Sequence, residues 1–126
     1  MEQSYFNKLE KLISNSYSPY SRLRVGAILV SEDGREFKGV NVENVSYGLT
    51  ICAERVAIFN AVTKGVKKFS KMYILSSSDK IIYPCGACLQ VLSEFVDVSF
   101  EIVLYSKKKS KKIFQLKDLL KKPFNI

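Results

Sequence analysis

The spacing of apolar positions along the chain predicts an alternation of helices and strands. Apolar residues recur every three or four positions in the segments that we expect to be helices, which are residues 4–15, 52–64, 86–95 and 116–120. Shorter apolar runs between turn residues predict strands at residues 25–30, 36–41, 72–75, 100–105 and near Ile113. The order α-β-β-α-β-α-β-β-α predicts an α/β fold, in which a mixed sheet of about five strands has helices on both faces.

Local signals add detail to these elements. Ser4 is the expected N-cap of the first helix, because its hydroxyl can accept a hydrogen bond from a free N–H group of the first turn. In the second helix we expect Val56, Phe59 and Val62 to face inward. Residues 41–51 lack a regular period, so we expect a loop there, the part of a fold where binding groups often lie.

The composition is that of a packed globular protein. The 126 residues, 47% of them apolar and 25% charged, fit one domain spanning residues 1–126. No apolar run reaches the roughly 18 residues of a membrane span. The first residues lack the basic and then apolar pattern of a secretory signal, which favours a cytoplasmic protein with no membrane partner.

The positive charge is concentrated near the C-terminus. From residue 100 onward eight lysines stand against two acidic residues, which accounts for +6 of the net charge of +8. Most of these lysines lie in residues 107–112, a run typical of a solvated turn between two strands. A nucleic-acid contact would need aromatic side chains among the lysines for base stacking, and this run has none. We therefore expect no nucleic-acid partner.

The counts of histidine and cysteine narrow the possible chemistry. The chain has no histidine, which excludes catalytic triads and zinc peptidase motifs that depend on imidazole. It has three cysteines, and an odd number in a chain of this kind argues against a disulfide framework. Two interpretations remain, inert packing of the thiols or a metal ion held by thiolates alone.

The three cysteines lie at predicted helix starts. Cys52 opens one helix, while Cys85 and Cys88 stand at the start of the next, where the helix dipole lowers the pKa of a thiol. Three protein ligands leave the fourth tetrahedral position of a zinc ion open for water, as in catalytic sites. Glu54 is placed to exchange a proton with that water without being a ligand. Arg55 is placed to donate hydrogen bonds to the sulfurs and to offset their negative charge.

Each of these features also has an ordinary interpretation. A single cysteine at a helix start is most often a small buried apolar residue. A lone C-x-x-C fits a redox site or half of a zinc knuckle equally well. A glutamate in the first turn of a helix is favourable to the dipole without any further role. Taken together, however, the spacings use every cysteine of the chain, which favours a catalytic zinc site.

The same residues resemble a known family. Cys52-Ala53-Glu54-Arg55 and Pro84-Cys85-Gly86-Ala87-Cys88 resemble the cytidine deaminases of the small, homotetrameric, three-cysteine type. Further similar segments are residues 17–21, 25–27, 39–44 and 119–120. The resemblance implies one zinc ion per subunit and hydrolytic deamination of cytidine and deoxycytidine to uridine and deoxyuridine, with release of ammonia, in pyrimidine salvage.

The resemblance also implies roles for individual residues. Glu54 matches the residue that takes a proton from the zinc-activated water, delivers it to ring N3 and later protonates the leaving amine. Asn41 and Glu43 match the pair that holds the ribose hydroxyls, although a polar strand end without a ligand is the alternative. Backbone groups near Ala53 are expected to contact the polar edge of the base. Tyr47 matches a tyrosine that enters the pocket of a neighbouring subunit, so the active sites are expected to be shared.

Three further positions carry open questions. Phe124 is a candidate for the aromatic residue that closes the pocket from another chain, with an anchor on its own core as the alternative. Leu23 stands where the family usually has a phenylalanine facing the base, so it offers apolar contact without ring stacking. Leu89 stands where the family usually has an arginine, which leaves Arg55 as the evident cation near the thiolates.

Three other functions compete with this interpretation. A related deaminase acting on another aminopyrimidine, such as blasticidin S, usually lacks an arginine at the position of Arg55. A polynucleotide deaminase typically has histidine in place of Cys52. A zinc-stabilised binding module needs a fourth protein ligand, and the chain offers neither a histidine nor a fourth cysteine for it.

Overall fold

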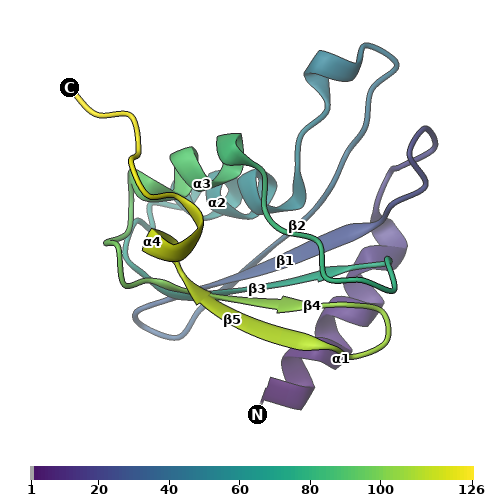
Figure 1. Ribbon diagram of the computed structural model, residues 1–126, viewed down its shortest axis with the longest axis horizontal. Coiled ribbons are helices and arrows are strands. Elements are labelled where there is room, and N and C mark those ends of the chain that lie inside the picture. The colour runs from purple at the N-terminus through teal and green to yellow at the C-terminus, as the bar shows by residue number, and fades with distance from the viewer. Residues whose placement is uncertain (1) are drawn as a thin grey trace.

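A single five-stranded sheet organises the chain. The computed structural model describes residues 2–126, and its sheet has the strand order β2-β1-β3-β4-β5 (Figure 1). The strands are β1 (Val25–Ser31), β2 (Glu36–Val40), β3 (Phe69–Ser76), β4 (Glu101–Tyr105) and β5 (Lys111–Gln115). Only β3 and β4 are parallel, and the crossover between them contains a helix, as parallel pairing requires. The predicted mixed sheet of about five strands is confirmed.

The helices lie on both faces of this sheet, as predicted. They are α1 (Glu2–Leu12), α2 (Ala53–Thr63), α3 (Gly86–Ser93) and α4 (Leu116–Leu119), and two short 3-10 turns, η1 (Ile13–Asn15) and η2 (Tyr47–Leu49), occur in the connections. α1 packs alone against one face, while α2 and α3 lie side by side over the other (Figure 1). None of the helices within residues 2–126 is long and apolar enough to cross a membrane.

Strand alternation supplies two separate cores. Successive residues of a strand point to opposite faces, so Ile28 packs under α1 with Phe6 and Leu9. The next residue, Leu29, packs on the other face with Ile58 of α2. Each core packs one face of the sheet against its helices. The core on the α2 and α3 side thereby holds the first turns of these two helices in place relative to the sheet.

The inward face of α2 differs from the prediction. Of the three residues that we expected to face inward, Val56 and Val62 are half-buried and Val62 packs against the core, but Phe59 is 47% exposed. The fully buried residues of α2 are Ala53, Glu54, Ala57, Ile58 and Ala61. The physical reason is close packing of α2 on β2. A Cβ atom on Gly39 would lie 2.4 Å from the backbone oxygen of Ala53. The absence of a side chain at Gly39 allows this approach, and the α2 residues buried there include the alanines Ala53 and Ala57, which give a weak hydrophobic pattern.

The N-terminal helix begins earlier than expected. α1 starts at Glu2, so Ser4 lies inside its first turn and the prediction that Ser4 is the N-cap is wrong. At the other end, the Arg24 guanidinium donates hydrogen bonds to the carbonyl oxygens of Ile13 and Ser14, at 3.4 and 2.9 Å. These bonds satisfy carbonyl groups that a helix end leaves free.

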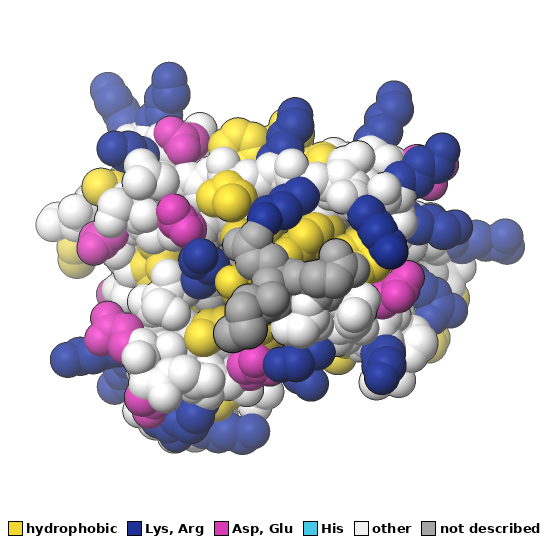
Figure 2. All heavy atoms as spheres, turned by 90° about the horizontal axis from the view of Figure 1, so that it is seen from below, with side chains coloured by type: hydrophobic (Ala, Val, Ile, Leu, Met, Phe, Trp, Pro, Cys, Tyr) yellow, Lys and Arg dark blue, Asp and Glu magenta, His cyan; other side chains and the backbone are white. Residues whose placement is uncertain are grey.

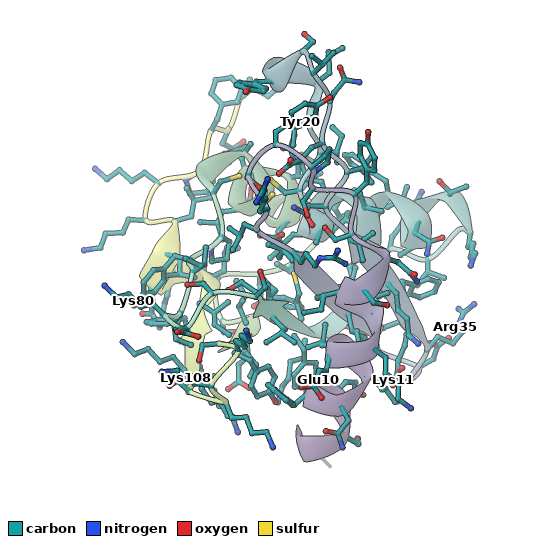
Figure 3. All side chains as sticks on the ribbon, turned by 90° about the vertical axis from the view of Figure 1, so that its right-hand side faces the viewer. Glu10, Lys11, Tyr20, Arg35, Lys80 and Lys108 are labelled. Carbon is teal, nitrogen blue, oxygen red and sulfur yellow. The ribbon has the colours of Figure 1, made fainter. Side chains whose placement is uncertain are left out.

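The lysine run forms the turn between β4 and β5, as predicted. Lys109 has a left-handed φ of 67°, and its N–H donates to the carbonyl of Ser106 at 3.0 Å. Lys80 and Lys108 lie at one corner of the molecule, well away from Tyr20 (Figure 3). On the face seen in Figure 2, Lys and Arg side chains project around the rim and apolar side chains gather toward the middle.

Candidate metal centre and active site

The three cysteines come together where two helices begin. Cys52 is the N-cap of α2, Cys85 is the N-cap of α3, and Cys88 lies in the first turn of α3. Their Sγ atoms all lie within 4.8 Å of one another, with 3.8 Å between Cys52 and Cys85 and 3.4 Å between Cys85 and Cys88. Cys88 is buried, Cys52 is half-buried and Cys85 is exposed, so the cluster opens to solvent on one side.

These distances fit a zinc ion. Two sulfurs of a tetrahedral zinc site, each bonded at about 2.3 Å, lie about 3.8 Å apart. No other group of three metal-ligating side chains of this kind occurs within residues 2–126. The set therefore offers three thiolate ligands and leaves one tetrahedral position without a protein ligand, which is the arrangement of a catalytic site.

Arg55 supplies positive charge at the sulfurs. Its Nη2 atom lies 3.6 Å from the Sγ of Cys52, and its Nε atom is buried with no hydrogen-bond partner among the described residues. The pKa of the Cys52 thiol is lowered to about 5, first because Cys88 donates a hydrogen bond to it and then because Arg55 does. Cys52 is therefore a thiolate at neutral pH, the form that binds a metal. Donation of a hydrogen bond to Cys52, and then burial, raise the pKa of the Cys88 thiol.

Glu54 lies beside the sulfurs in the first turn of α2. Its side chain is buried, with 5% of the residue exposed. Burial raises the pKa of this carboxyl group to about 7, and the negative charge of Cys52 adds to the effect. A buried carboxyl group with a pKa near 7 can both accept and return a proton at neutral pH, as a general acid and base must.

Backbone pairing brings the segment after β2 next to Cys52. Val42 and Ile51 exchange two hydrogen bonds of 3.0 Å, so the loop that we expected at residues 41–51 closes directly before Cys52. On the other side of the segment, Glu43 donates its N–H to the carbonyl of Tyr17 at 2.8 Å. Asn41 and Glu43 are thereby held near the start of α2.

Asn41 and Glu43 hold the segment before β1 in place. The side-chain amide of buried Asn41 donates to the carbonyl of Leu23 at 2.8 Å and accepts from the N–H of Val25 at 3.0 Å. Glu43, also buried, accepts from the backbone N–H groups of Tyr20 and Ser21 at 3.0 and 3.1 Å, and from the Ser21 hydroxyl. The Ser21 hydroxyl, more than the two backbone groups, holds the pKa of Glu43 below its usual range.

A cavity of about 320 Å³ opens at Glu43. Its other lining residues are Tyr20, Ser21, Tyr47 and Thr50. We had predicted no role for Tyr20 and Ser21, although both belong to the segment of residues 17–21 that resembles the deaminases. These residues offer hydrogen-bond donors, the backbone N–H groups of both and the hydroxyl of Ser21. Only the fold shows that these donors face Glu43.

Tyr47 and Phe124 are both largely exposed in a single chain. Tyr47 is 75% exposed on η2, and its ring lies 6.0 Å from the ring of Tyr20. Phe124 is 79% exposed, so its side chain is not an anchor on its own core. Its backbone is instead hydrogen-bonded to Gln90 of α3.

The remaining predicted positions lie around the site. Ala53 is fully buried as the first residue of α2, so its backbone begins the helix next to Cys52. Leu23 is half-buried, and its N–H donates to the Ser21 hydroxyl at 3.0 Å. Leu89 of α3 packs in the core. Its side chain is apolar and brings no charge to the thiolates.

Comparisons with known proteins agree with this geometry. A family model described as the cytidine and deoxycytidylate deaminase zinc-binding region matches residues 1–104. The chain is 43% identical to the cytidine deaminase of Sporosarcina psychrophila over 103 residues, 76% of each chain. It is 36% identical to that of Mycoplasma pneumoniae over 121 residues, 94% of this chain and 90% of the relative. The crystal structure of cytidine deaminase from Burkholderia pseudomallei superposes with a TM-score of 0.92 at 36% identity, covering 98% of this chain and 99% of the other.

The family match and the sulfur geometry together identify the metal and its ligands. Zinc is bound by Cys52, Cys85 and Cys88, the residues that meet at the starts of α2 and α3. The match extends across α1, the sheet through β4 and both metal-bearing helices, which is well over half of the chain. This chain is therefore a member of the cytidine and deoxycytidylate deaminase family.

Proposed function

We propose that this protein is a cytidine deaminase that converts cytidine and deoxycytidine to uridine and deoxyuridine with release of ammonia. The observation that carries the proposal is the meeting of three sulfurs and one buried carboxyl group at the starts of α2 and α3. Relatives named cytidine deaminase align over this region at 36–43% identity. The substrate is a small nucleoside. The product is a uracil nucleoside, which fits a role in pyrimidine salvage.

The reaction exchanges an amino group for an oxygen atom. A bound zinc ion supplies the Lewis acidity that makes water nucleophilic near neutral pH. The carboxylate of Glu54 accepts a proton from the attacking water as its oxygen bonds to C4 of the base, and passes that proton to ring N3. The remaining proton of the oxygen now bonded to C4 goes through Glu54 to the amino group, which leaves as ammonia when the C4–N bond breaks and the C4 carbonyl forms. A pKa of about 7 suits Glu54 to both transfers.

Sugar binding falls to the residues at the cavity beside Glu43. Glu43 lines this cavity, and Asn41 holds the adjoining strand end. A carboxylate accepts hydrogen bonds from two sugar hydroxyls, and an amide can accept one and donate another. Leu23, which is half-buried next to this segment, provides apolar contact for the base. A deoxyribose substrate retains the 3′ hydroxyl and therefore keeps part of these contacts.

We further propose that the chain is one domain that works in the cytoplasm as a homotetramer with shared active sites. The loop around η2 exposes apolar side chains that a single chain leaves in water, including Val45, Tyr47 and Leu49. The Phe124 ring is exposed as well. Contact with another copy buries such groups and adds them to a neighbouring pocket. The lysine turn lies at a different corner from Tyr20 and is given no part in binding (Figure 3).

Turnover of cytidine by the purified protein tests the proposal. Loss of absorbance at the cytidine band is expected, together with one zinc per chain. Glu54→Gln keeps the size of the side chain but cannot accept a proton, so this variant should keep its zinc and lose turnover. A chain that binds stoichiometric zinc yet deaminates no nucleoside would overturn the proposal and leave a zinc-stabilised binding module instead.

A further inference from the structure

The C-terminal segment is attached to the metal-bearing helix α3 by a pair of hydrogen bonds. The N–H of Phe124 donates to Oε1 of Gln90 at 2.8 Å, and Nε2 of Gln90 donates to the carbonyl oxygen of Phe124 at 3.0 Å. One carboxamide thus satisfies both backbone groups of a single residue, as a neighbouring strand would. Figure 1 shows the segment after α4 (yellow) on the side of the sheet where α3 lies, with the C-terminus pointing away from the sheet.

The attachment uses the backbone and leaves the side chain free. Phe124 is 79% exposed, so little apolar contact holds the segment at this point. The last residues of a domain are usually poorly ordered unless specific contacts hold them. Here the two bonds to Gln90 provide such a contact, and they join residues 34 positions apart in the sequence.

Gln90 shares a rigid element with two zinc ligands. α3 is an eight-residue helix that begins at Gly86, with Cys85 as its N-cap and Cys88 in its first turn. Because Gln90 lies two positions after Cys88 on the same helix, the backbone of Phe124 is fixed relative to the metal site.

We propose that Gln90 is a positioning residue, whose carboxamide sets where the Phe124 ring stands so that the ring covers the nucleoside pocket of a second copy of this chain. The inference rests on the proposed function. The second copy is the occupant because Phe124 is largely exposed on its own chain and the proposed assembly of shared active sites brings another copy to it. The cavity at Glu43 and Tyr47 is likewise open on one side in a single chain.

Steady-state kinetics of a Gln90→Met variant test this inference. Methionine keeps the length of the side chain and forms neither hydrogen bond, and two lost amide bonds lower the equilibrium constant for docking of the segment about tenfold. We expect KM for cytidine to rise by up to about tenfold, with kcat within about twofold and zinc content unchanged, because uniform binding is lost. Gln90→Glu can still accept from the Phe124 N–H but repels its carbonyl oxygen, so its KM should be intermediate. Asn60→Ala, which removes an amide bond of 3.4 Å from α2 to the carbonyl of Lys38, is the matched control and should leave KM unchanged.

A double-mutant cycle separates positioning from general stability. If Gln90 acts through the ring, Gln90→Met should raise KM by less than about twofold in a Phe124→Ala background. Full additivity of the two effects would overturn the proposal. A fall in kcat of Gln90→Met with loss of zinc and unchanged KM would also overturn the proposal. Such a result would mean that Gln90 only supports the fold of α3.

A spectroscopic measurement tests the attachment without substrate. The chain has no tryptophan, so Phe124→Trp creates a single fluorescent reporter on the segment. Adding Gln90→Met should lower its steady-state anisotropy, and an unchanged anisotropy would contradict the attachment. Absence of cytidine turnover in the unchanged protein would refute the proposed function and this role of the ring together, whereas normal turnover with unchanged KM in the Gln90 variants would refute this inference alone.

Discussion

The close approach of α2 to β2 makes Gly39 the position whose substitution best tests the link between packing and the metal site. In Gly39→Ala the new Cβ would lie 2.4 Å from the carbonyl oxygen of Ala53 and 2.5 Å from the backbone nitrogen of Ala57. Ordinary contact begins at 3.4 Å, so the α2 backbone must move away by about 1 Å. Both clashing atoms belong to backbone, so no side-chain rotation relieves the contact.

The displacement has a structural cost and a functional one. Overpacking of this kind destabilises a protein by about 1–3 kcal/mol. α2 carries Cys52, whereas Cys85 and Cys88 belong to α3, so the shift changes the distances between the sulfurs. Zinc sites tolerate about 0.2 Å, so we expect zinc affinity to fall about 10- to 100-fold. Because Glu54 moves with α2, kcat should fall by up to about 100-fold.

Gly26→Ala is the matched control on the neighbouring strand. Its Cβ would lie 2.9 Å from Ile13 Cγ2 and 3.4 Å from Leu12 Cδ2, which are side-chain methyl groups, not backbone atoms, on the face of the sheet that α1 covers. We expect a loss below about 1 kcal/mol and unchanged zinc affinity. Urea denaturation and competition with a chromogenic chelator measure the two quantities. If Gly39→Ala matched Gly26→Ala in both, the reasoning from close packing to metal geometry would be refuted.

Three further predictions concern the site itself. Glu54→Gln should lower kcat about 10²- to 10⁴-fold with zinc content unchanged, as measured by turnover and metal analysis, because proton transfer is lost. Asn41→Ala leaves a backbone N–H and a backbone carbonyl without their side-chain partner. The free energy of unfolding should therefore fall by about 1–3 kcal/mol, and KM should rise. An unfolding free energy equal to that of the unchanged protein would contradict this. Bonding to Ser21 lowers the pKa of Glu43, so its contribution to stability is complete above the ordinary value of 4.5 and is lost as the pH falls through the lowered pKa. Glu43→Gln should therefore reduce the loss of stability between pH 5 and 2 in thermal melts, and an unchanged acid profile would argue against the carboxylate's role.

The elements that were predictable had strong local signals. The order of helices and strands, the zinc ligands and the helix starts at Cys52 and Cys85 follow from apolar spacing and from the cysteine positions, and the structure confirms them. The strand β5 gave only a faint pattern near Ile113, because it is an edge strand with its first three residues exposed. An exposed edge places little constraint on side-chain alternation, so its bounds could not be predicted.

What the sequence missed depends on contacts between distant segments. The prediction for the inward face of α2 was wrong at Phe59, which is exposed, and it missed the buried alanines, which carry little hydrophobic signal. The close approach is visible only when Gly39 of β2 is seen under the helix. The bonds between Gln90 and Phe124 likewise join a side chain to backbone groups 34 positions away, and no pattern of residues predicts such a pair.

X-ray absorption at the zinc edge tests the central claim most directly, since it counts the atoms around the metal. For the purified protein with one zinc per chain, we expect three sulfur neighbours at about 2.3 Å and one oxygen or nitrogen neighbour at about 2.0 Å. Cys88→Ala should abolish this signal by losing the metal. Four sulfur neighbours, or a zinc that persists in Cys88→Ala with its sulfur count unchanged, would contradict a site built from three cysteines with one position left for water.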